Sequence, residues 1–214
     1  MKITKIGHCC LLIEVEGSRI LTDPGSFTVE DLVTDNIDVI LITHEHADHL
    51  HIDSVKKIVE VNPKVQIFSN SSVGKLLSEA SIPFSLLEGR DMIICCGIEL
   101  EAFDGIHEEI YEEIGRVQNT GYFIAGRLFY PGDSYINPHK AVEILAFPFG
   151  GPWCKIADAI HYVLDVKPKH AIPVHDAIER EDRVGILHRI PTTLFPEHSI
   201  NFKPMKAGDI EIFN

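Results

Sequence analysis

Short apolar runs in the first 70 residues predict a group of β-strands. Residues 3–6, 11–15 and 18–21 are three such runs, and the last two are separated by a turn at Glu16-Gly17. Short apolar runs bounded by turn residues are typical of strands. Residues 38–43 form one continuous apolar run, which indicates a strand buried on both faces. A further strand is expected over residues 65–69.

Later segments alternate between helical and strand-like patterns. Apolar residues at 52, 55, 58 and 59 predict an amphipathic helix over 52–61, and those at 156, 157, 160, 163 and 164 predict another over 155–166. Helices are also expected over 73–80 and near 183–190. Strands are expected over 92–95, 98–103, 121–125, 128–130, 141–147 and 170–174, with hairpin turns at Gly97 and Gly126-Arg127.

This order of elements predicts an α/β fold. Two mixed β-sheets packed face to face, with helices on both outer faces, would bury these patterns in a four-layer αβ/βα sandwich. The 214 residues contain no internal repeat and no linker-like stretch, so a single domain over residues 1–214 is expected.

Composition narrows the possible partners and the compartment. With 19 Lys and Arg against 32 Asp and Glu, the net charge of −13 counts against a nucleic-acid or anionic-membrane partner. No apolar run reaches the length of a membrane-spanning helix, and the first residues do not resemble a signal peptide. The five cysteines are a poor disulfide framework, so they are expected to be small buried apolar residues in a reducing, cytoplasmic setting.

The chemistry is concentrated in the motif His44-Glu45-His46-Ala47-Asp48-His49, which directly follows the apolar run 38–43. Imidazole nitrogens and carboxylate oxygens suit zinc and neighbouring first-row metals. Three imidazoles and a carboxylate in six residues are more ligands than one ion would take from a single turn. The motif therefore predicts a two-metal hydrolytic site that draws its other ligands from downstream.

Other metal-competent residues also follow apolar segments. Asp23, His107, Asp133 and His175 each stand just past the end of one. Taken singly, His107 is equally well read as a solvated histidine, and Asp133 and His175 as ordinary turn residues. Taken together, polar residues at repeated strand ends are typical of a site built on loops over a rigid scaffold.

These residues make the sequence resemble the metallo-β-lactamase fold superfamily of metal-dependent hydrolases over nearly its whole length. The matching motifs are Thr22-Asp23-Pro24, the motif at 44–49, His107, Pro131-Gly132-Asp133-Ser134 and Pro173-Val174-His175-Asp176. The start Ile6-Gly7-His8-Cys9-Cys10 and the short length resemble the branch that includes L-ascorbate-6-phosphate lactonase and related small bacterial hydrolases.

The resemblance implies a ligand set for two divalent ions, with zinc expected and manganese or iron as alternatives. One ion would be held by His44, His46 and His107, the second by Asp48, His49 and His175, with Asp133 bridging both. The catalytic residues would be Asp48 and Asp133, which orient a hydroxide shared by the ions. Asp23 is expected to accept a hydrogen bond from a ligand imidazole, and His8 to pack beneath the site without binding metal.

Substrate contacts are less clearly marked by the sequence. Tyr111, Trp153 and Lys155 are candidates. A core aromatic residue and a lysine at a helix start are nevertheless the favoured interpretation of Trp153 and Lys155, and an incidental neighbour of His107 is that of Tyr111.

The leading hypothesis is a hydrolase that cleaves an ester, lactone or phosphodiester bond of a small molecule. One alternative is a metal- or ligand-binding protein of the same fold without turnover, and another is a nucleic-acid phosphodiesterase. A redox role resembling flavin-partnered di-iron relatives is disfavoured because position 46 is His where they carry Glu. The ligands set the nucleophile but not the substrate.

Overall fold

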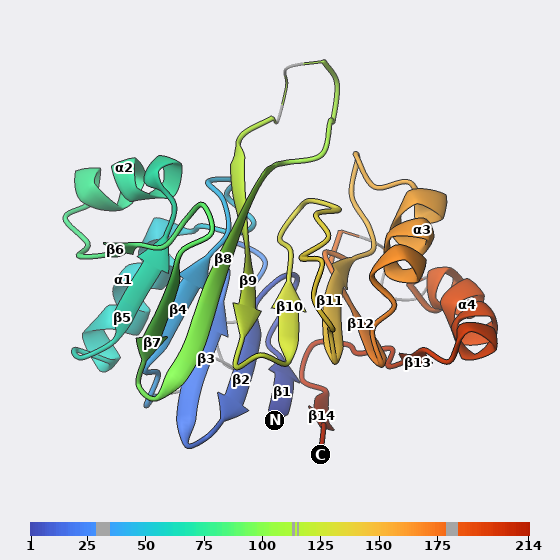
Figure 1. Cartoon of the computed structure of the whole chain (residues 1–214). Coiled ribbons are helices and arrows are strands. Elements are labelled where there is room, and N and C mark those ends of the chain that lie inside the picture. Colours follow the sequence, from blue (N-terminus) through green and yellow to red (C-terminus); the bar gives the residue numbers. More distant parts are fainter. Residues whose placement is uncertain (29–34, 113, 115, 179–183) are drawn as a thin grey trace.

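Two mixed β-sheets lie face to face, with α1 and α2 on one outer side and α3 and α4 on the other (Figure 1). The computed structural model describes residues 1–28, 35–112, 114, 116–178 and 184–214, without the side chains of residues 184 and 186. The predicted four-layer α/β sandwich is confirmed.

The first sheet has the strand order β14-β1-β2-β3-β4-β5-β6. Its strands are antiparallel from β14 to β3 and parallel from β3 to β6. The bounds are β1 (Lys2–Lys5), β2 (Leu11–Val15), β3 (Ser18–Thr22), β4 (Val39–Ile42), β5 (Gln66–Ser69), β6 (Ser85–Leu86) and β14 (Ile210–Ile212), with α1 (Ile52–Val61) and α2 (Ser71–Glu79) outside.

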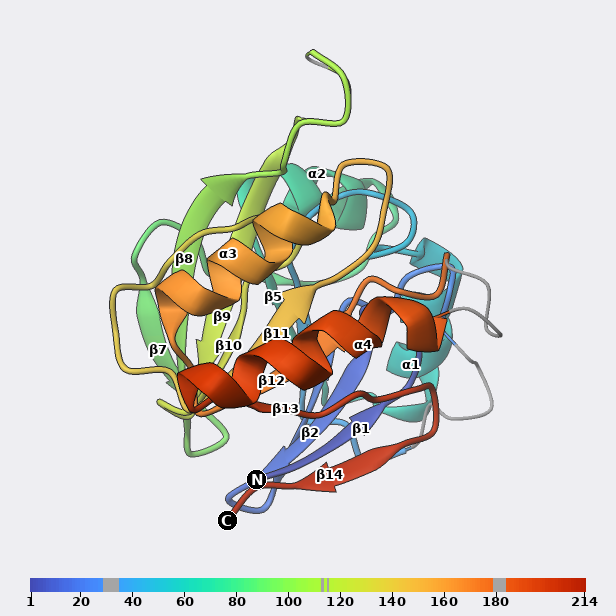
Figure 2. The same cartoon turned by 90° about the vertical axis from the view of Figure 1, so that its right-hand side faces the viewer.

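The second sheet has the order β13-β12-β11-β10-β9-β8-β7, antiparallel from β7 to β10 and parallel from β10 to β13. Figure 2 shows α3 and α4 lying over it. The bounds are β7 (Met92–Cys95), β8 (Ile98–Ile106), β9 (Gln118–Ile124), β10 (Leu128–Tyr130), β11 (Ile144–Pro148), β12 (His170–Val174) and β13 (Asn201–Phe202), with α3 (Ile156–Val166), α4 (Val184–Leu194) and a 3₁₀ helix (Phe195–His198).

Strand β4 shows how the layers are held together. Successive side chains of a strand point to opposite faces. Val39 and Leu41 therefore enter the core between the sheets, while Ile40 and Ile42 enter the core under α1 and α2. All four are fully buried. The prediction of a strand buried on both faces is confirmed, and this strand leads directly into the loop of residues 44–49.

Some expectations need correction. The three short strands β6, β13 and β14 were not predicted, because two or three residues give no readable period. Strand β9 begins at Gln118, three residues before its predicted start, because the buried polar residues Asn119 and Thr120 belong to the strand. The predicted helix near 183–190 starts at Arg183, outside the described residues, and α4 continues through Pro191 to Leu194.

The cysteines agree only in part with the expectation. All five are free thiols, as predicted. Cys96 is exposed and Cys154 is half-buried, which corrects the expectation that all five are buried. Cys96 is exposed because it lies in the β7–β8 turn, where its φ of 52° and that of 81° at Gly97 reverse the chain.

Among the described residues, no helix combines the length and the apolarity that crossing a bilayer requires. The single domain over residues 1–214 stays a prediction.

Replacement of Leu41 tests the central position of β4. We expect Leu41→Ala to lower the free energy of unfolding by about 3 kcal/mol, because it opens a cavity between the sheets. Leu86→Ala, at a leucine of the same sheet that is 54% exposed, should change it by less than about 1 kcal/mol. Urea denaturation measures both variants, and equal losses would contradict this account of the core.

Candidate metal centre

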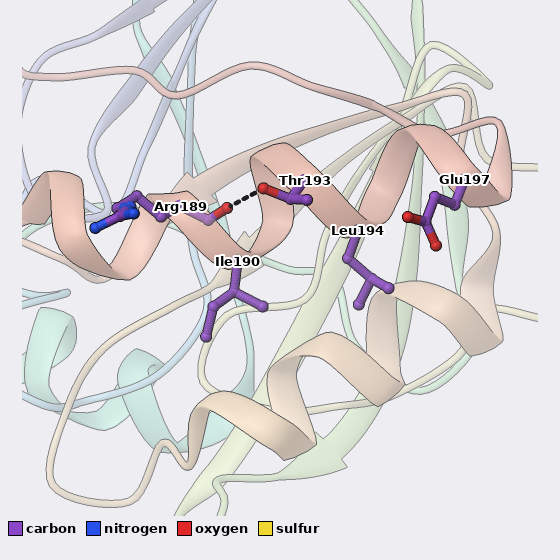
Figure 3. A pocket seen from close by; sticks show the side chains of 5 residues that line it. All are labelled: Arg189, Ile190, Thr193, Leu194 and Glu197. Atoms are coloured by element: carbon purple, nitrogen blue, oxygen red, sulfur yellow. Dashed lines mark hydrogen bonds between the residues drawn. The ribbon is translucent and has the colours of Figure 1, made fainter.

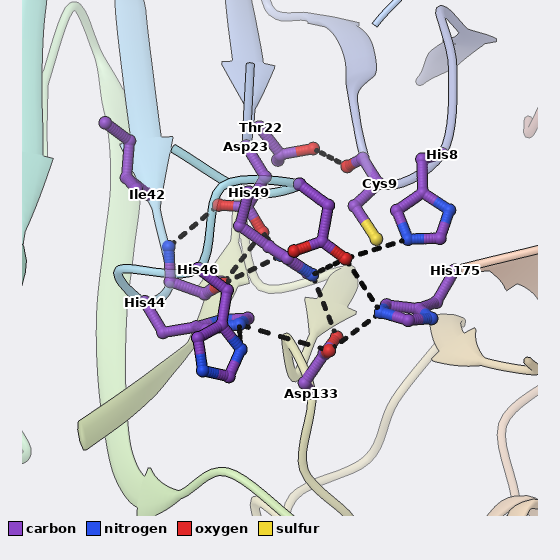
Figure 4. Close-up of polar contacts among 12 residues, drawn as sticks. His8, Cys9, Thr22, Asp23, Ile42, His44, His46, His49, Asp133 and His175 are labelled. Atoms are coloured by element: carbon purple, nitrogen blue, oxygen red, sulfur yellow. Dashed lines mark hydrogen bonds and ion pairs between the residues drawn. The ribbon is translucent and has the colours of Figure 1, made fainter. Parts of the chain in front are cut away.

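The predicted ligands lie in loops that follow strands of both sheets. The residues of the 44–49 motif come after β4 of the first sheet, and His107, Asp133 and His175 come after β8, β10 and β12 of the second. The structure brings these loops together at one edge of the sandwich, with most of the ligands visible in Figure 4. All are buried except His46 and Asp48, which are partly exposed.

His44, His46 and His107 form a first group. One ring nitrogen from each lies within 4.8 Å of the other two. Nε2 of His44 lies 3.2 Å from Nδ1 of His46. Nδ1 of His107 donates a hydrogen bond of 2.6 Å to the carbonyl oxygen of Glu108. Because a carbonyl can only accept, Nδ1 carries the proton and Nε2 of the neutral ring is left with a free lone pair.

His49, His175 and Asp48 form a second group. Oδ2 of Asp48 lies 3.4 Å from Nε2 of His175 and 4.0 Å from Nε2 of His49. Nδ1 of His49 donates a hydrogen bond of 2.7 Å to Oδ2 of Asp23. This bond turns Nε2 of His49 toward the centre of the site, in the orientation that a metal ligand needs.

Asp133 lies between the two groups. Its Oδ2 is 3.2 Å from Nε2 of His107 in the first group and 2.8 Å from Nε2 of His175 in the second. Its Oδ1 is 3.2 Å from Nε2 of His49, and its Oδ2 is 3.9 Å from Nε2 of His44. One carboxylate therefore contacts imidazoles of both groups, as a bridging ligand would.

Unsatisfied atoms test whether divalent ions fit here. Nε2 of His49 and Oδ1 of Asp133 are both buried, and neither has a hydrogen-bond partner among the described residues. Buried polar atoms without partners are rare because they cost free energy. Imidazole nitrogens and carboxylate oxygens in these numbers are the donor set that zinc, manganese and iron accept. The residues present fit the group that the sequence predicts.

Comparison with protein families decides the affiliation. Residues 2–175 match the family model described as the beta-lactamase superfamily domain. The chain belongs to the β-lactamase superfamily. This match confirms the resemblance to the superfamily that the sequence motifs indicated.

Relatives agree with this assignment. Protein Rv0786c of Mycobacterium tuberculosis is 33% identical over 88% of this chain and 90% of its own length. UPF0173 protein PF0020 of Pyrococcus furiosus is 31% identical over 82% and 83%, and other UPF0173 relatives bear the name metal-dependent hydrolase. N-acyl-phosphatidylethanolamine-hydrolyzing phospholipase D 1 of Caenorhabditis elegans is 31% identical over 86% of this chain and 62% of its own length.

Solved structures share the fold of this superfamily member. Igni18, a metallo hydrolase from the archaeon Ignicoccus hospitalis, superposes with a TM-score of 0.77 over 100% of this chain and 99% of its own. The two sequences are only 18% identical, so the likeness concerns the fold alone.

Asp23 supports the ligands of this superfamily member from behind. Its carboxylate accepts hydrogen bonds from the backbone N–H of Thr43 at 2.8 Å, the Thr43 hydroxyl at 2.7 Å and Nδ1 of His49 at 2.7 Å. The hydroxyl of Tyr130 lies 2.6 Å from the same carboxylate. Thr43 also contacts Nδ1 of His44 at 3.0 Å. Asp23 thus orients one ligand directly and a second through Thr43.

His8 lies beside the second group. Its Nδ1 accepts a hydrogen bond of 3.1 Å from the N–H of Ala177, which leaves the proton on Nε2, 3.3 Å from Oδ2 of Asp48. Its carbonyl oxygen accepts the N–H of His175 at 3.0 Å. His8 therefore contacts both Asp48 and His175.

Sequence reasoning missed several residues that hold the loops of the site. Nζ of Lys5, only 2% exposed, contacts both carboxylate oxygens of Asp176, at 2.6 and 2.8 Å, directly after the predicted ligand His175. Oδ1 of Asn119 accepts the N–H of Asp133 at 3.0 Å. The buried position of Lys5 could have been inferred from the sequence, because alternation along β1 places Lys5 on the same inward-facing side as Ile3.

The charge states of Asp133, Asp48 and His44 agree with metal binding. Burial raises the pKa of Asp133, but His49 and His175 beside it hold that pKa well below its usual range. Burial, reinforced by His49, lowers the pKa of His44 well below its ordinary value. Burial raises the pKa of Asp48 as well, yet hydrogen bonds from His175 and His8 lower it. Ionised carboxylates and a neutral imidazole are the protonation states that bind metal. Burial lowers the pKa values of His49 and His175, but the neighbouring Asp133 raises both well above the ordinary value, so these two imidazoles would release protons when metal binds.

The proposed substrate residues differ in their distance from the ligands. Half-buried Trp153 has its ring centroid 5.4 Å from those of both His107 and His175, so it borders the site. Tyr111 is 63% exposed and pairs through an isolated bridge with Ile114. Lys155 is exposed at the N-cap of α3. Among the described contacts, none joins Tyr111 or Lys155 to a ligand.

Close backbone packing holds the loops against each other. A Cβ atom on Gly25 would lie 1.8 Å from the carbonyl oxygen of Asp48, and one on Gly150 would lie 2.5 Å from that of His175. Only glycine fits where two backbones approach this closely. The loops that carry Asp48 and His175 are therefore set by main-chain contacts.

A surface hollow along α4 belongs to a different part of the molecule. It is lined by Arg189, Ile190, Thr193, Leu194 and Glu197 (Figure 3). None of these is a predicted site residue, and polar groups that converge as they do at the metal centre are absent from this lining.

Removal of one hydrogen-bond acceptor tests the role of Asp23. We expect Asp23→Asn to weaken zinc affinity about 10- to 100-fold, because the amide offers a donor where the His49 Nδ1–H needs an acceptor. Asp209→Asn, an exposed acceptor of the Lys206 N–H, should bind zinc as the wild type does. Competition with a chromophoric chelator measures both variants, and unchanged affinity for Asp23→Asn would refute the role.

The ion pair of Lys5 with Asp176 gives a separate prediction. Lys5→Met leaves the Asp176 carboxylate buried without its main counter-charge, so stability should fall by about 3–5 kcal/mol. Asp176→Asn in the Lys5→Met background should recover part of the loss. Urea denaturation of the two variants measures this, and a double variant no more stable than Lys5→Met would contradict the explanation.

Proposed function

We propose that this chain is a dinuclear metal-dependent hydrolase that cleaves an ester, lactone or phosphodiester bond of a small molecule. The observation that carries the proposal is the position of Asp133, whose carboxylate lies within 3.2 Å of imidazoles from both ligand groups. A site for a single ion would not need a carboxylate between two complete groups. We propose zinc for both positions, with manganese or iron as alternatives.

The bound ions and the two aspartates would have different roles in the reaction. Two bound divalent ions would supply a hydroxide nucleophile near neutral pH and stabilise negative charge on the reacting bond. Asp133, buried between the groups, would orient that nucleophile. Asp48 is 25% exposed, so its carboxylate can both orient the nucleophile and pass a proton to solvent.

Contacts around Asp48 favour this role. Its Oδ2 faces Nε2 of His8 at 3.3 Å and Nε2 of His175 at 3.4 Å. These contacts keep the carboxylate ionised and aimed at the second group. A protein that only stored metal would not need an accessible, ionised carboxylate, so the contacts favour turnover over binding alone.

The surroundings support a small-molecule substrate. Trp153, which borders both His107 and His175, offers an aromatic face to a bound substrate. The net charge of −13 opposes a nucleic acid as the substrate. The name of the Caenorhabditis elegans relative refers to a phospholipase D, a phosphodiester hydrolase, which supports including phosphodiesters. We propose a cytoplasmic location, in keeping with the five free thiols.

Metal loading and a substrate screen test the proposal together. Protein purified without added metal and then dialysed against zinc should hold two ions per chain by elemental analysis. Lactones, carboxylic esters and phosphodiesters should be screened with zinc, manganese and iron. Asp48→Asn should lower kcat at least about 100-fold, because it removes the proton acceptor. Asp209→Asn, exposed and far along the sequence from every ligand, serves as the control.

Two results would overturn the proposal. A single ion per chain in the wild type would refute the dinuclear site. Two bound ions without hydrolysis in the whole screen, together with unchanged ligand affinity in Asp133→Asn, would favour the alternative of a binding protein without turnover.

A further inference from the structure

Cys9 lies beside the second ligand group and has no role in the proposed hydrolysis. It follows β1 in the loop of residues 6–10 and is 1% exposed. Figure 4 shows its sulfur pointing toward the side of the site where His8, His49 and His175 lie. One ligand atom from each of these four residues lies within 4.8 Å of the other three.

The neighbouring cysteine points the other way. Cys10 enters the core under α1 and α2 with Ile6 and Leu12, whereas Cys9 faces the space between the sheets. Two adjacent residues with the same side chain therefore occupy opposite faces of one backbone. Only the first of them reaches the metal centre.

The backbone around Cys9 is held by hydrogen bonds, which set the direction of its Cα–Cβ bond. Its carbonyl oxygen accepts a hydrogen bond of 2.9 Å from the Thr22 hydroxyl and lies 2.9 Å from the hydroxyl of Tyr130. The N–H groups of Ile6 and Gly7 donate to the carbonyl oxygen of Cys10 at 2.8 and 3.3 Å. Tyr130 also contacts Asp23, which orients His49.

We propose that Sγ of Cys9 is a thiolate ligand of the second metal ion, together with His49 and His175. The proposal rests on the metal site proposed above and adds a ligand to it. Nε2 of His49 lies 3.2 Å from Oδ1 of Asp133 but makes no hydrogen bond among the described residues, while its Nδ1 donates to Asp23, so a buried ring nitrogen close to the thiol is available to an ion. Nδ1 of His8 accepts the N–H of Ala177 and its Nε2 faces Oδ2 of Asp48 at 3.3 Å, so the proposal does not require His8 as a ligand.

A sulfur ligand would change which metal the second position selects. Thiolates favour zinc, cobalt and iron over manganese and magnesium, which prefer oxygen ligands. Mixed cysteine and histidine ligation is common for zinc. Metal binding would displace the thiol proton, so one proton is released for each thiolate–metal bond that forms. The second position would then discriminate against manganese more strongly than the first, which has only histidines and Asp133.

Cobalt(II) alone is the probe, used with the full chain. Two bound cobalt ions per chain, with their visible d–d bands, report that the metal site exists. A thiolate-to-cobalt charge-transfer band in the near ultraviolet reports a sulfur ligand. We expect the band in the wild type and in Cys10→Ala, and its loss in Cys9→Ser. Zinc affinity of the second position should fall at least about 10-fold in Cys9→Ser, and manganese affinity by much less.

X-ray absorption of the zinc-loaded wild type gives a second measurement that needs no variant. We expect a sulfur neighbour at about 2.3 Å in addition to nitrogen and oxygen at about 2.0–2.1 Å. Two bound ions with only nitrogen and oxygen neighbours would overturn the role of Cys9 and leave the dinuclear site standing. A charge-transfer band that survives in Cys9→Ser would do the same. Failure of the wild type to bind either cobalt or zinc would overturn both proposals.

Discussion

Asp133 carries a negative charge in a place that water does not reach, and the rest of the site is arranged around that charge. An ionised carboxylate is costly to bury unless charges or donors of opposite character surround it. Imidazoles of His44, His49, His107 and His175 supply that surrounding at 2.8–3.9 Å. They come from three separate loops, so the charge can be accommodated only after the two sheets have packed against each other.

Polar contacts between the sheets secure that packing at the edge where the site lies. The Tyr122 hydroxyl on β9 lies 3.1 Å from the carbonyl oxygen of Ile42 on β4, and the Tyr130 hydroxyl on β10 lies 2.6 Å from Asp23 after β3. The N–H of Thr120 donates to the carbonyl oxygen of Thr43 at 2.9 Å. Deeper in the sandwich, apolar side chains of both sheets, such as Leu41 of β4 and Ile144 of β11, belong to one core cluster. The polar contacts therefore determine the register of the loops, while the apolar core supplies most of the stability.

Much of this arrangement could be predicted from sequence. The apolar run before the 44–49 motif predicted a central strand, because Val39 to Ile42 are apolar on both faces. The helix over 52–61 agrees at both ends with α1. Strand-end residues such as His107 and His175 were predicted to converge because metal-competent residues at repeated strand ends are typical of a site built on loops over a rigid scaffold. The structure does bring them together.

Other features depend on long-range contacts that no local pattern encodes. Thr43 and Tyr130 are unremarkable ends of apolar runs, and only the folded chain shows that both contact Asp23. Lys5 could be placed on an inward face by alternation, but its partner Asp176 lies 171 positions away. The role proposed for Cys9 could not be predicted either, because a cysteine buried in a core and a cysteine beside a metal site have the same apolar sequence context.

The main-chain contacts at Gly25 and Gly150 have a consequence for how proteins of this fold diversify. Where neighbouring loops touch through peptide groups, the side chains at the outer rim of the site contribute little to the placement of the reactive centre. Outer positions such as Trp153, Tyr111 and Lys155 can then be exchanged without disturbing the ligands. Most members of a library randomised at these outer positions should still fold and bind metal. Substitutions at the two glycines should disrupt the site, because a Cβ atom there would clash with the neighbouring backbone. New substrate preferences would thus arise from substitutions at the outer positions, while the loops that carry the ligands stay unchanged.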